Sequence, residues 1–177
     1  MPGKHTLESF DQELLLLREE VQRLADQAEE ELERAMQALL HDDRTLAQEV
    51  VTSDLIADRL QERINHHMTI VLARQQAMAD DLREILAAGR IAAHLERLAD
   101  YAKNTAKRTQ ALTRKADIEI GAQFSWMSDR VGAMLRQVMR AYQERDAAEA
   151  NVAWSSDVGL DQKLQVRFNQ PMDRASV

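Results

Sequence analysis

The stretch AAHLERLADYAKNTA, residues 92–106, decides how this chain is built. Its apolar residues return every three or four positions, which is the period of a helix with one buried face. The same stretch places Glu96 and Asp100 four residues apart, one turn apart on a single helix face. Like charges at this spacing repel by roughly a few tenths of a kcal/mol on an exposed helix. The pair therefore needs a partner, either a cation or hydrogen-bond donors.

The composition favours long helices over sheets. The chain has 177 residues, of which 45% are apolar and only 4% aromatic, with Gly 5 and Pro 2. A net charge of −7 argues against sequence-independent nucleic-acid binding, which needs a basic surface. Cysteine is absent, which excludes disulfides and thiolate metal sites. No apolar run approaches the roughly 20 residues of a membrane span, and no signal peptide is visible, so we expect a cytoplasmic protein.

Apolar periodicity predicts an all-α fold with about five helices. We expect them over residues 7–40, 44–72, 78–112, 125–145 and 147–167. Helices of about 30 residues are long for a globular domain but normal in antiparallel bundles with short turns. Because no sustained a/d heptad with e/g charges is present, an antiparallel long-helix bundle is favoured over a simple coiled coil.

The chain repeats itself at an offset of 103 residues. Residues 36–58 align with residues 139–161 at seven identical positions, and Asp43 meets Asp146 in this alignment. A period near 100 residues indicates two related three-helix units rather than a solenoid. In the first unit, Asp42-Asp43 is expected to supply a break and an N-cap for the second helix.

The repeat suggests a division into two parts. We expect a first three-helix repeat over residues 7–112, a linker over 113–123 that contains Gly121, and an incomplete second repeat over 124–177. The second repeat is predicted to be incomplete because the sequence ends before a sixth helix could form.

Three carboxylate pairs share the four-residue spacing: Glu96 with Asp100, Asp54 with Asp58, and Asp157 with Asp161. If pairs from neighbouring helices meet, their oxygens surround a common point, which suits Mg²⁺, Ca²⁺, Mn²⁺, iron or, less selectively, Zn²⁺. A bound cation would turn the repulsion into attraction. The alternative is that these acids are solvated or paired with arginine, and the spacing does not separate the two.

The turn between the second and third helices is charged. In RQQAMADDLR, residues 74–83, Asp80 or Asp81 can cap the third helix, while Arg74 and Arg83 flank the corner. The stretch is typical of a capped turn and is also a candidate partner-binding corner.

Catalytic signatures are missing from the sequence. There is no Ser/His/Asp set, Gly-rich loop or P-loop, and no Glu-x-x-His spacing of the kind that di-iron carboxylate enzymes use. His66 and His67 are interpreted as helix-surface histidines. We therefore predict that the protein is not an enzyme.

Four segments resemble the PhoU family of bacterial phosphate-uptake regulators: SFDQELLLLREEV (9–21), SDLIADRL (53–60), RQQAMADDLR (74–83) and, most strongly, AAHLERLADYAKNTAKR (92–108). The resemblance covers residues 9–107, with a weaker second copy over 124–161. It implies tandem three-helix bundles whose E/D-x-x-x-D motifs bind multinuclear metal clusters. The metal is divalent or trivalent: iron or zinc, with magnesium or manganese also reported.

The family motifs map onto this sequence residue by residue. They fall on Glu96 and Asp100 and on Asp54 and Asp58, with Asp157 and Asp161 as the weaker counterparts in the second repeat. The missing third helix of that repeat puts a second metal site in doubt. Gln76 also stands where the family often has proline, which weakens the argument for a rigid corner.

The resemblance also implies a role. It predicts a negative regulator of phosphate uptake and of the phosphate-starvation response, an adaptor between the cytoplasmic subunits of the phosphate ABC transporter and a sensor histidine kinase. Such proteins are cytoplasmic, reach the membrane only through these partners, and are often homodimers. Two alternatives stay open: a shortened homologue that is only a structural or interaction module, and a carboxylate-metal protein of another role.

Overall fold

Long helices make up almost all of the chain that this computed structural model describes, namely residues 3–74, 79–112 and 118–155. They are α1 (Gly3–His41), α2 (Arg44–Arg74), α3 (Ala79–Ala111) and α4 (Ile118–Glu144). Residues 147–155 are also helical, and no strand occurs within the described ranges. The all-α prediction is confirmed. None of the described helices has both the length and the apolar character needed to cross a membrane.

The bounds of α2 and α3 agree with the predicted ones to within two residues, whereas α1 begins at Gly3 instead of residue 7 and α4 begins at Ile118 instead of residue 125. The predicted linker over 113–123 contains Gly121, but a single glycine inside a helix costs only about 1 kcal/mol, and here it lies within α4. It also allows a close approach, because a Cβ atom here would lie 3.3 Å from Cδ2 of Leu40. The later part of segment 113–123 is therefore helical, and its role as a linker between two repeats stays a prediction.

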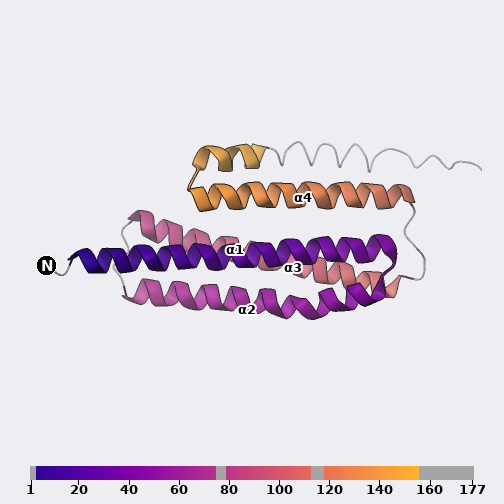
Figure 1. Cartoon of the computed structure of the whole chain (residues 1–177), viewed down its shortest axis with the longest axis horizontal. Helices are drawn as coiled ribbons and strands as arrows, with labels where there is room; N and C mark the ends of the chain where they lie inside the picture. The colour runs from indigo at the N-terminus through magenta and orange to yellow at the C-terminus, as the bar shows by residue number, and fades with distance from the viewer. Residues whose placement is uncertain (1–2, 75–78, 113–117, 156–177) are drawn as a thin grey trace, which may run out of the picture. The chain divides into compact units, whose positions relative to one another are not determined.

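The helices α1, α2 and α3 lie side by side as one bundle, in which each helix runs back along the one before it (Figure 1). At the end formed by the start of α1, the end of α2 and the start of α3, the core is built from large side chains, among them Leu17, Leu24, Ile64 and Ile85. Burying each of these side chains contributes roughly 1.5–3 kcal/mol. This apolar end supplies most of the hydrophobic stabilisation of the bundle.

The fully buried core at the opposite end of the bundle is built mostly from small residues, with the partly buried Leu32, Leu46 and Val51 packed against it. Its core cluster consists of Ala35, Ala38, Ala47, Val50, Ala102 and Ala106. Alanines let three helix backbones approach closely, but each buries less apolar area than leucine. Polar interactions therefore carry a larger share of the stability at this alanine-rich end than at the apolar end.

The corner between α1 and α2 is set by two aspartates. Asp42 has a φ of 55°, the left-handed conformation that ends many helices and that aspartate tolerates. The Asp43 N–H then donates to the Ala38 carbonyl at 2.9 Å. The Asp43 Oδ1 accepts a hydrogen bond from the Leu46 N–H at 2.9 Å, so Asp43 is the N-cap of α2 as predicted.

The corner after α4 has the same geometry 103 residues later. Arg145 also has a φ of 55°, and the Asp146 N–H donates to the Ala141 carbonyl at 2.9 Å. The Asp146 Oδ1 accepts hydrogen bonds from the N–H groups of Ala148 and Glu149 at 2.8 and 3.0 Å. The internal repeat seen in the sequence is therefore a repeat of backbone structure at this corner.

The chain divides into two compact units, Met1–Gly132 and Ala133–Val177. Within the described part of the second unit, Met139, Ala141 and Ala153 are buried. The segment 156–167, where the predicted fifth helix would continue, lies outside the described residues.

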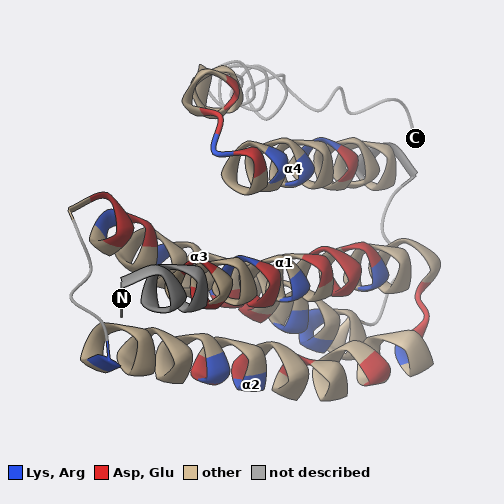
Figure 2. Ribbon diagram, turned by 60° about the vertical axis from the view of Figure 1, so that its left-hand side comes forward, with Lys and Arg blue, Asp and Glu red and all other residues tan. Residues whose placement is uncertain are grey.

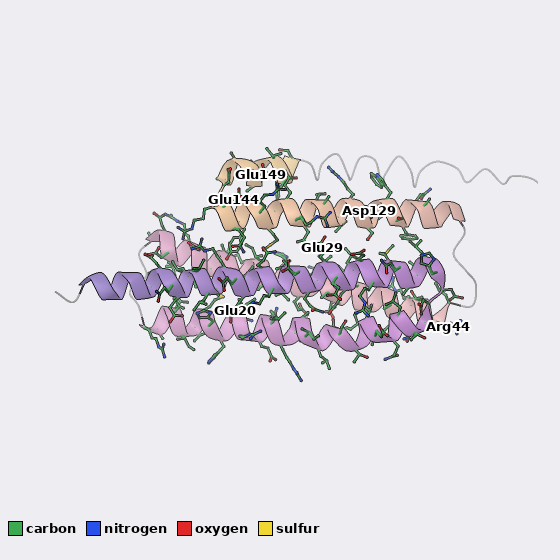
Figure 3. The ribbon with its side chains drawn as sticks, in the orientation of Figure 1. Glu20, Glu29, Arg44, Asp129, Glu144 and Glu149 are labelled. Carbon is green, nitrogen blue, oxygen red and sulfur yellow. The ribbon has the colours of Figure 1, made fainter. Side chains whose placement is uncertain are left out.

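His67 of α2 is held between two carboxylates of α1. Its Nδ1 lies 2.9 Å from Glu20 Oε2, and its Nε2 lies 2.9 Å from Glu13 Oε2. Arg63 Nε adds a positive charge 3.7 Å from Glu20 Oε1, and Figure 3 labels Glu20 on the side of α1 that faces α2. The His67 side chain is only 14% exposed, so its interpretation as a surface histidine is wrong.

Two acceptors around one imidazole favour its doubly protonated form. Burial alone would lower the pKa of His67, but hydrogen bonds to Glu20 and Glu13, together with their charges, raise it above the ordinary 6.5. The charged imidazolium therefore stabilises the α1–α2 contact.

We expect this contact to make stability depend on pH. Since the folded pKa of His67 is above its unfolded value, its contribution is fully present below about pH 6.5 and is lost as the pH rises through the folded pKa. His67→Gln should lower the free energy of unfolding at about pH 6 by roughly 1–2 kcal/mol, and by less at about pH 8.5. Urea unfolding at both pH values checks this, with the exposed His66→Gln as control. Equal losses at the two pH values would contradict it.

Candidate cation site between α2 and α3

Carboxylates of α2 and α3 meet around one ammonium group. Lys103 Nζ donates to Asp54 Oδ2 at 2.6 Å and to Asp100 Oδ1 at 2.5 Å. Asp54 comes from α2, whereas Asp100 and Lys103 stand one turn apart on α3. The acids that face each other across the two helices thus share a single positive charge.

Asp54 sits on the buried seam of α2. It follows the apolar positions Ala47 and Val50 and precedes Ala57, all of them buried, and is itself only 4% exposed. A carboxylate in such a place is costly unless it is paired and hydrogen-bonded. Lys103 meets this need because its four-carbon stem covers apolar surface while its head reaches the carboxylate. Hydrogen bonds to Asp100 and Asp54 raise the pKa of Lys103, so its ammonium stays charged.

Glu96 and Asp58 lie within electrostatic range of this pair. Burial raises the pKa of Glu96, and the negative charges of Asp100, Asp58 and Asp54 add to the effect, while Lys103 opposes it. The structure therefore brings the four predicted residues of α2 and α3 into one neighbourhood, with Asp54 and Asp100 at its centre.

A fifth carboxyl group comes from α1. Glu31 is 1% exposed, and its Oε1 accepts a hydrogen bond from Gln27 Nε2 at 2.7 Å. Its Oε2 is buried without a hydrogen-bond partner among the described residues. Burial raises the pKa of Glu31 and the charge of Asp54 raises it further, while the side chains of Gln27 and Ser53 and the charge of Lys103 oppose the shift. We define the carboxylate cluster as Glu31, Asp54, Asp58, Glu96 and Asp100 with Lys103.

Sequence reasoning missed Glu31 and Lys103, although Glu31 left a signal. It occupies a register of the buried stripe of α1, between the fully buried Ala28 and Ala35. A charged residue at an apolar register indicates a buried partner on a neighbouring helix. Lys103 left no such signal, because a lysine three residues after an aspartate is common on any helix surface.

The carboxylate cluster has the oxygen ligands that suit a hard cation, but these oxygens are not arranged around a common metal position. Carboxylate oxygens are the ligands that Mg²⁺, Mn²⁺ and Ca²⁺ prefer. Within the described residues, however, no three His, Asp or Glu side chains are grouped so that they could hold a metal ion. The place between Asp54 and Asp100 is taken by the lysine ammonium. The metal assignment stays a prediction, and Asp157 and Asp161 lie outside the described residues.

The predicted corner residues lie at the two helix ends that face segment 75–78, which is outside the described residues. Arg74 is the exposed last residue of α2, and Asp81 is half-buried in the first turn of α3. Arg83 is exposed and pairs with Asp80 on the same helix. An exposed pair of this kind contributes little stability. A partner-binding role for this corner stays a prediction.

Comparison with known proteins gives consistent matches. The PhoU domain family matches residues 21–109, which span most of α1–α3. A "phosphate-specific transport system accessory protein PhoU homolog" of Rhizobium meliloti is 32% identical over 162 residues, which cover 91% of this chain and 68% of that protein. The homologue of the same name from Caulobacter vibrioides is 34% identical over 168 residues, covering 94% and 73%.

A solved structure agrees with the fold. The crystal structure of PhoU from Pseudomonas aeruginosa superposes with a TM-score of 0.82 at 25% identity, over 89% of this chain and 76% of that one. The present chain thus spans roughly two thirds to three quarters of the relatives' length.

We expect the central ion pair to matter for stability more than its neighbour does. Asp54→Asn leaves a buried amide where Lys103 needs a charge, and it should lower the free energy of unfolding by about 1–3 kcal/mol. Asp58→Asn changes a more exposed member of the same helix and should stay within about 0.5 kcal/mol. Chemical denaturation at neutral pH compares the two variants. A loss for Asp58→Asn equal to that for Asp54→Asn would contradict the central place of Asp54.

Proposed function

The chain belongs to the PhoU family, and we propose on that basis that it is an accessory regulator of phosphate transport that acts by binding other proteins rather than by catalysis. The observation that carries the proposal is the match of residues 21–109, because it covers the bundle that holds the carboxylate cluster. The relatives' names place them with the phosphate-specific transport system.

The finer role that we propose is negative regulation in the cytoplasm. The protein would hold the cytoplasmic subunits of the phosphate ABC transporter and a sensor histidine kinase, and would repress the starvation response when phosphate is plentiful. Association with a second copy of the chain remains a further prediction. Long helices suit an adaptor, since their outer faces offer extended surfaces without a deep pocket.

The outer face of α1 supports this adaptor role. We define the acidic face as Glu19, Asp26, Glu30 and Glu33, which are exposed and follow one another along α1. Figure 2 shows acidic residues along much of this helix. Arg23 lies 3.7 Å from Glu19 and Arg34 lies 3.6 Å from Glu30, so the four acids of this face are partly compensated and the face keeps a net negative charge. A net negative face steers a complementary basic partner and selects against the wrong one. The acidic face is therefore our candidate surface for the transporter or the kinase.

We also propose that the carboxylate cluster takes up a metal ion, with iron, zinc, magnesium and manganese as candidates. The oxygen donors of Asp54, Asp58, Glu96 and Asp100 support this proposal by their chemistry and their common neighbourhood. When bound, the ion would supply positive charge that links α2 to α3. Its uptake requires that Lys103 give way.

Deleting the gene in the source organism tests the regulatory role. We expect alkaline phosphatase, a reporter of the starvation response, to be as high in phosphate-rich medium as in starved cells, and the wild-type gene to restore repression. A purely structural module would leave the reporter repressed in phosphate-rich medium after deletion.

Charge reversal then tests the acidic face. The triple variant Asp26→Lys, Glu30→Lys and Glu33→Lys should fold, by circular dichroism, but fail to restore repression. The matched control reverses three exposed acids elsewhere, namely Glu62→Lys, Asp129→Lys and Glu144→Lys, and should restore it; Asp129 and Glu144 are labelled in Figure 3. Equal behaviour of the two triple variants would reject the acidic face as the binding surface.

A further inference from the structure

We propose that Lys103 is a tethered competitor for the metal ion: its ammonium occupies the place between Asp54 and Asp100, and a divalent cation binds there only when the lysine leaves. This inference rests on the cation site proposed above and is separate from the regulatory role. Lysine and metal would then alternate as the positive charge that links α2 to α3.

The distances support competition for one place. Nζ lies 2.6 Å from Asp54 Oδ2 and 2.5 Å from Asp100 Oδ1. While the ammonium lies this close to both oxygens, no metal ion can bind between them. A metal ion bound by both carboxylates therefore has to displace the ammonium rather than join it.

The charge balance favours exchange for a cation of higher charge. One ammonium pairs directly with Asp54 and Asp100. Glu96 interacts electrostatically with both of these acids, with Asp58 and with Lys103. A single positive charge therefore undercompensates the cluster. A divalent cation carries twice that charge and accepts six or more oxygen ligands, water included.

Glu31 provides an independent sign that the cluster is not saturated. Its side chain is 1% exposed, and its Oε2 is buried without a hydrogen-bond partner within the described residues. The negative charge of Asp54 and the positive charge of Lys103 both act on it, so it faces the same cluster. A second positive charge at the cluster would compensate this carboxyl group from α1, which the lysine alone does not.

Lys103 is also able to leave. Its side chain is 20% exposed, so solvent can be reached without opening the apolar core. A lysine ammonium is strongly hydrated and sits on a flexible stem. Displacement therefore exchanges two ion pairs for hydration and leaves the packing of α1–α3 in place.

The test is a titration of the full chain, stripped of metal, with Mn²⁺, where electron paramagnetic resonance measures the free ion. We expect Lys103→Met to bind Mn²⁺ about 10- to 100-fold more tightly than wild type, the range over which groups beside a metal ligand shift affinity. Lys103→Arg keeps the positive charge and should bind no more tightly than wild type. Lys107→Met removes an exposed lysine one turn further along α3 and should match wild type.

Two further variants keep the result interpretable. Lys103→Gln replaces the methionine variant if that one does not fold, and it should show the same gain in affinity. Lys103→Met combined with Asp100→Asn should lose the gain if the ion binds between the two carboxylates. Mn²⁺ should also raise the thermal midpoint of Lys103→Met more than that of wild type, because the ion binds only the folded chain.

The other possible results of the Mn²⁺ titration would each reject either the competition by Lys103 or the cation site itself. Equal Mn²⁺ affinity of wild type and Lys103→Met would reject the competition while leaving the cation site standing. Absence of Mn²⁺ binding in every variant would reject both. Loss of repression in the reporter assay bears on neither, since it measures the regulatory role alone.

Discussion

The buried carboxylate of Asp54 is the constraint around which α2 and α3 are arranged. Taking an ionised aspartate out of water costs several kcal/mol, and only a well-placed cation offsets that cost. Lys103 does so at 2.6 Å, and Asp100 secures the lysine from the same helix. Sliding α3 by one turn would remove the ammonium and leave Asp54 unpaired. The ion pair therefore favours one register of α3 on α2, at the end of the bundle where alanines provide little side-chain interlocking.

This arrangement answers the question raised by the four-residue acid spacing. The residue that matters to Asp100 is not Glu96, one turn before it, but Asp54 on the neighbouring helix. The repulsion between Glu96 and Asp100 is the smaller effect, roughly a few tenths of a kcal/mol on an exposed helix. The pairing of Asp100 and Asp54 through Lys103 is larger because Asp54 is buried. The four-residue spacing places the two acids on one face of α3. Their contribution to stability depends on the side chains of α2 that contact this face.

The features that could be predicted from sequence are those that a single helix encodes. Apolar periodicity predicts the helices, and aspartate at a break predicts the cap, since Asp43 interacts with its own next turn. Between helices, the meeting of the α2 and α3 acids was predicted, but the side chains that pair with charged residues across helices were missed. His67 looks like a surface residue until Glu13 and Glu20 are placed opposite it. Lys103 likewise has meaning only once the register of α2 on α3 is known.

The two ends of the bundle are held by different forces, and this difference has a functional consequence. Large side chains such as Leu17, Leu24 and Ile64 bind the apolar end, and such packing responds little to the ions in solution. The alanine-rich end depends more on the charges of the carboxylate cluster. Under the proposed exchange of Lys103 for a metal ion, the strength of the α2–α3 contact would change while the apolar end stays packed. Switching proteins commonly work through a local electrostatic event that biases a larger element. A bundle built this way can change the strength of one helix contact without unfolding, because the charges that hold that contact lie apart from the side chains that hold the fold.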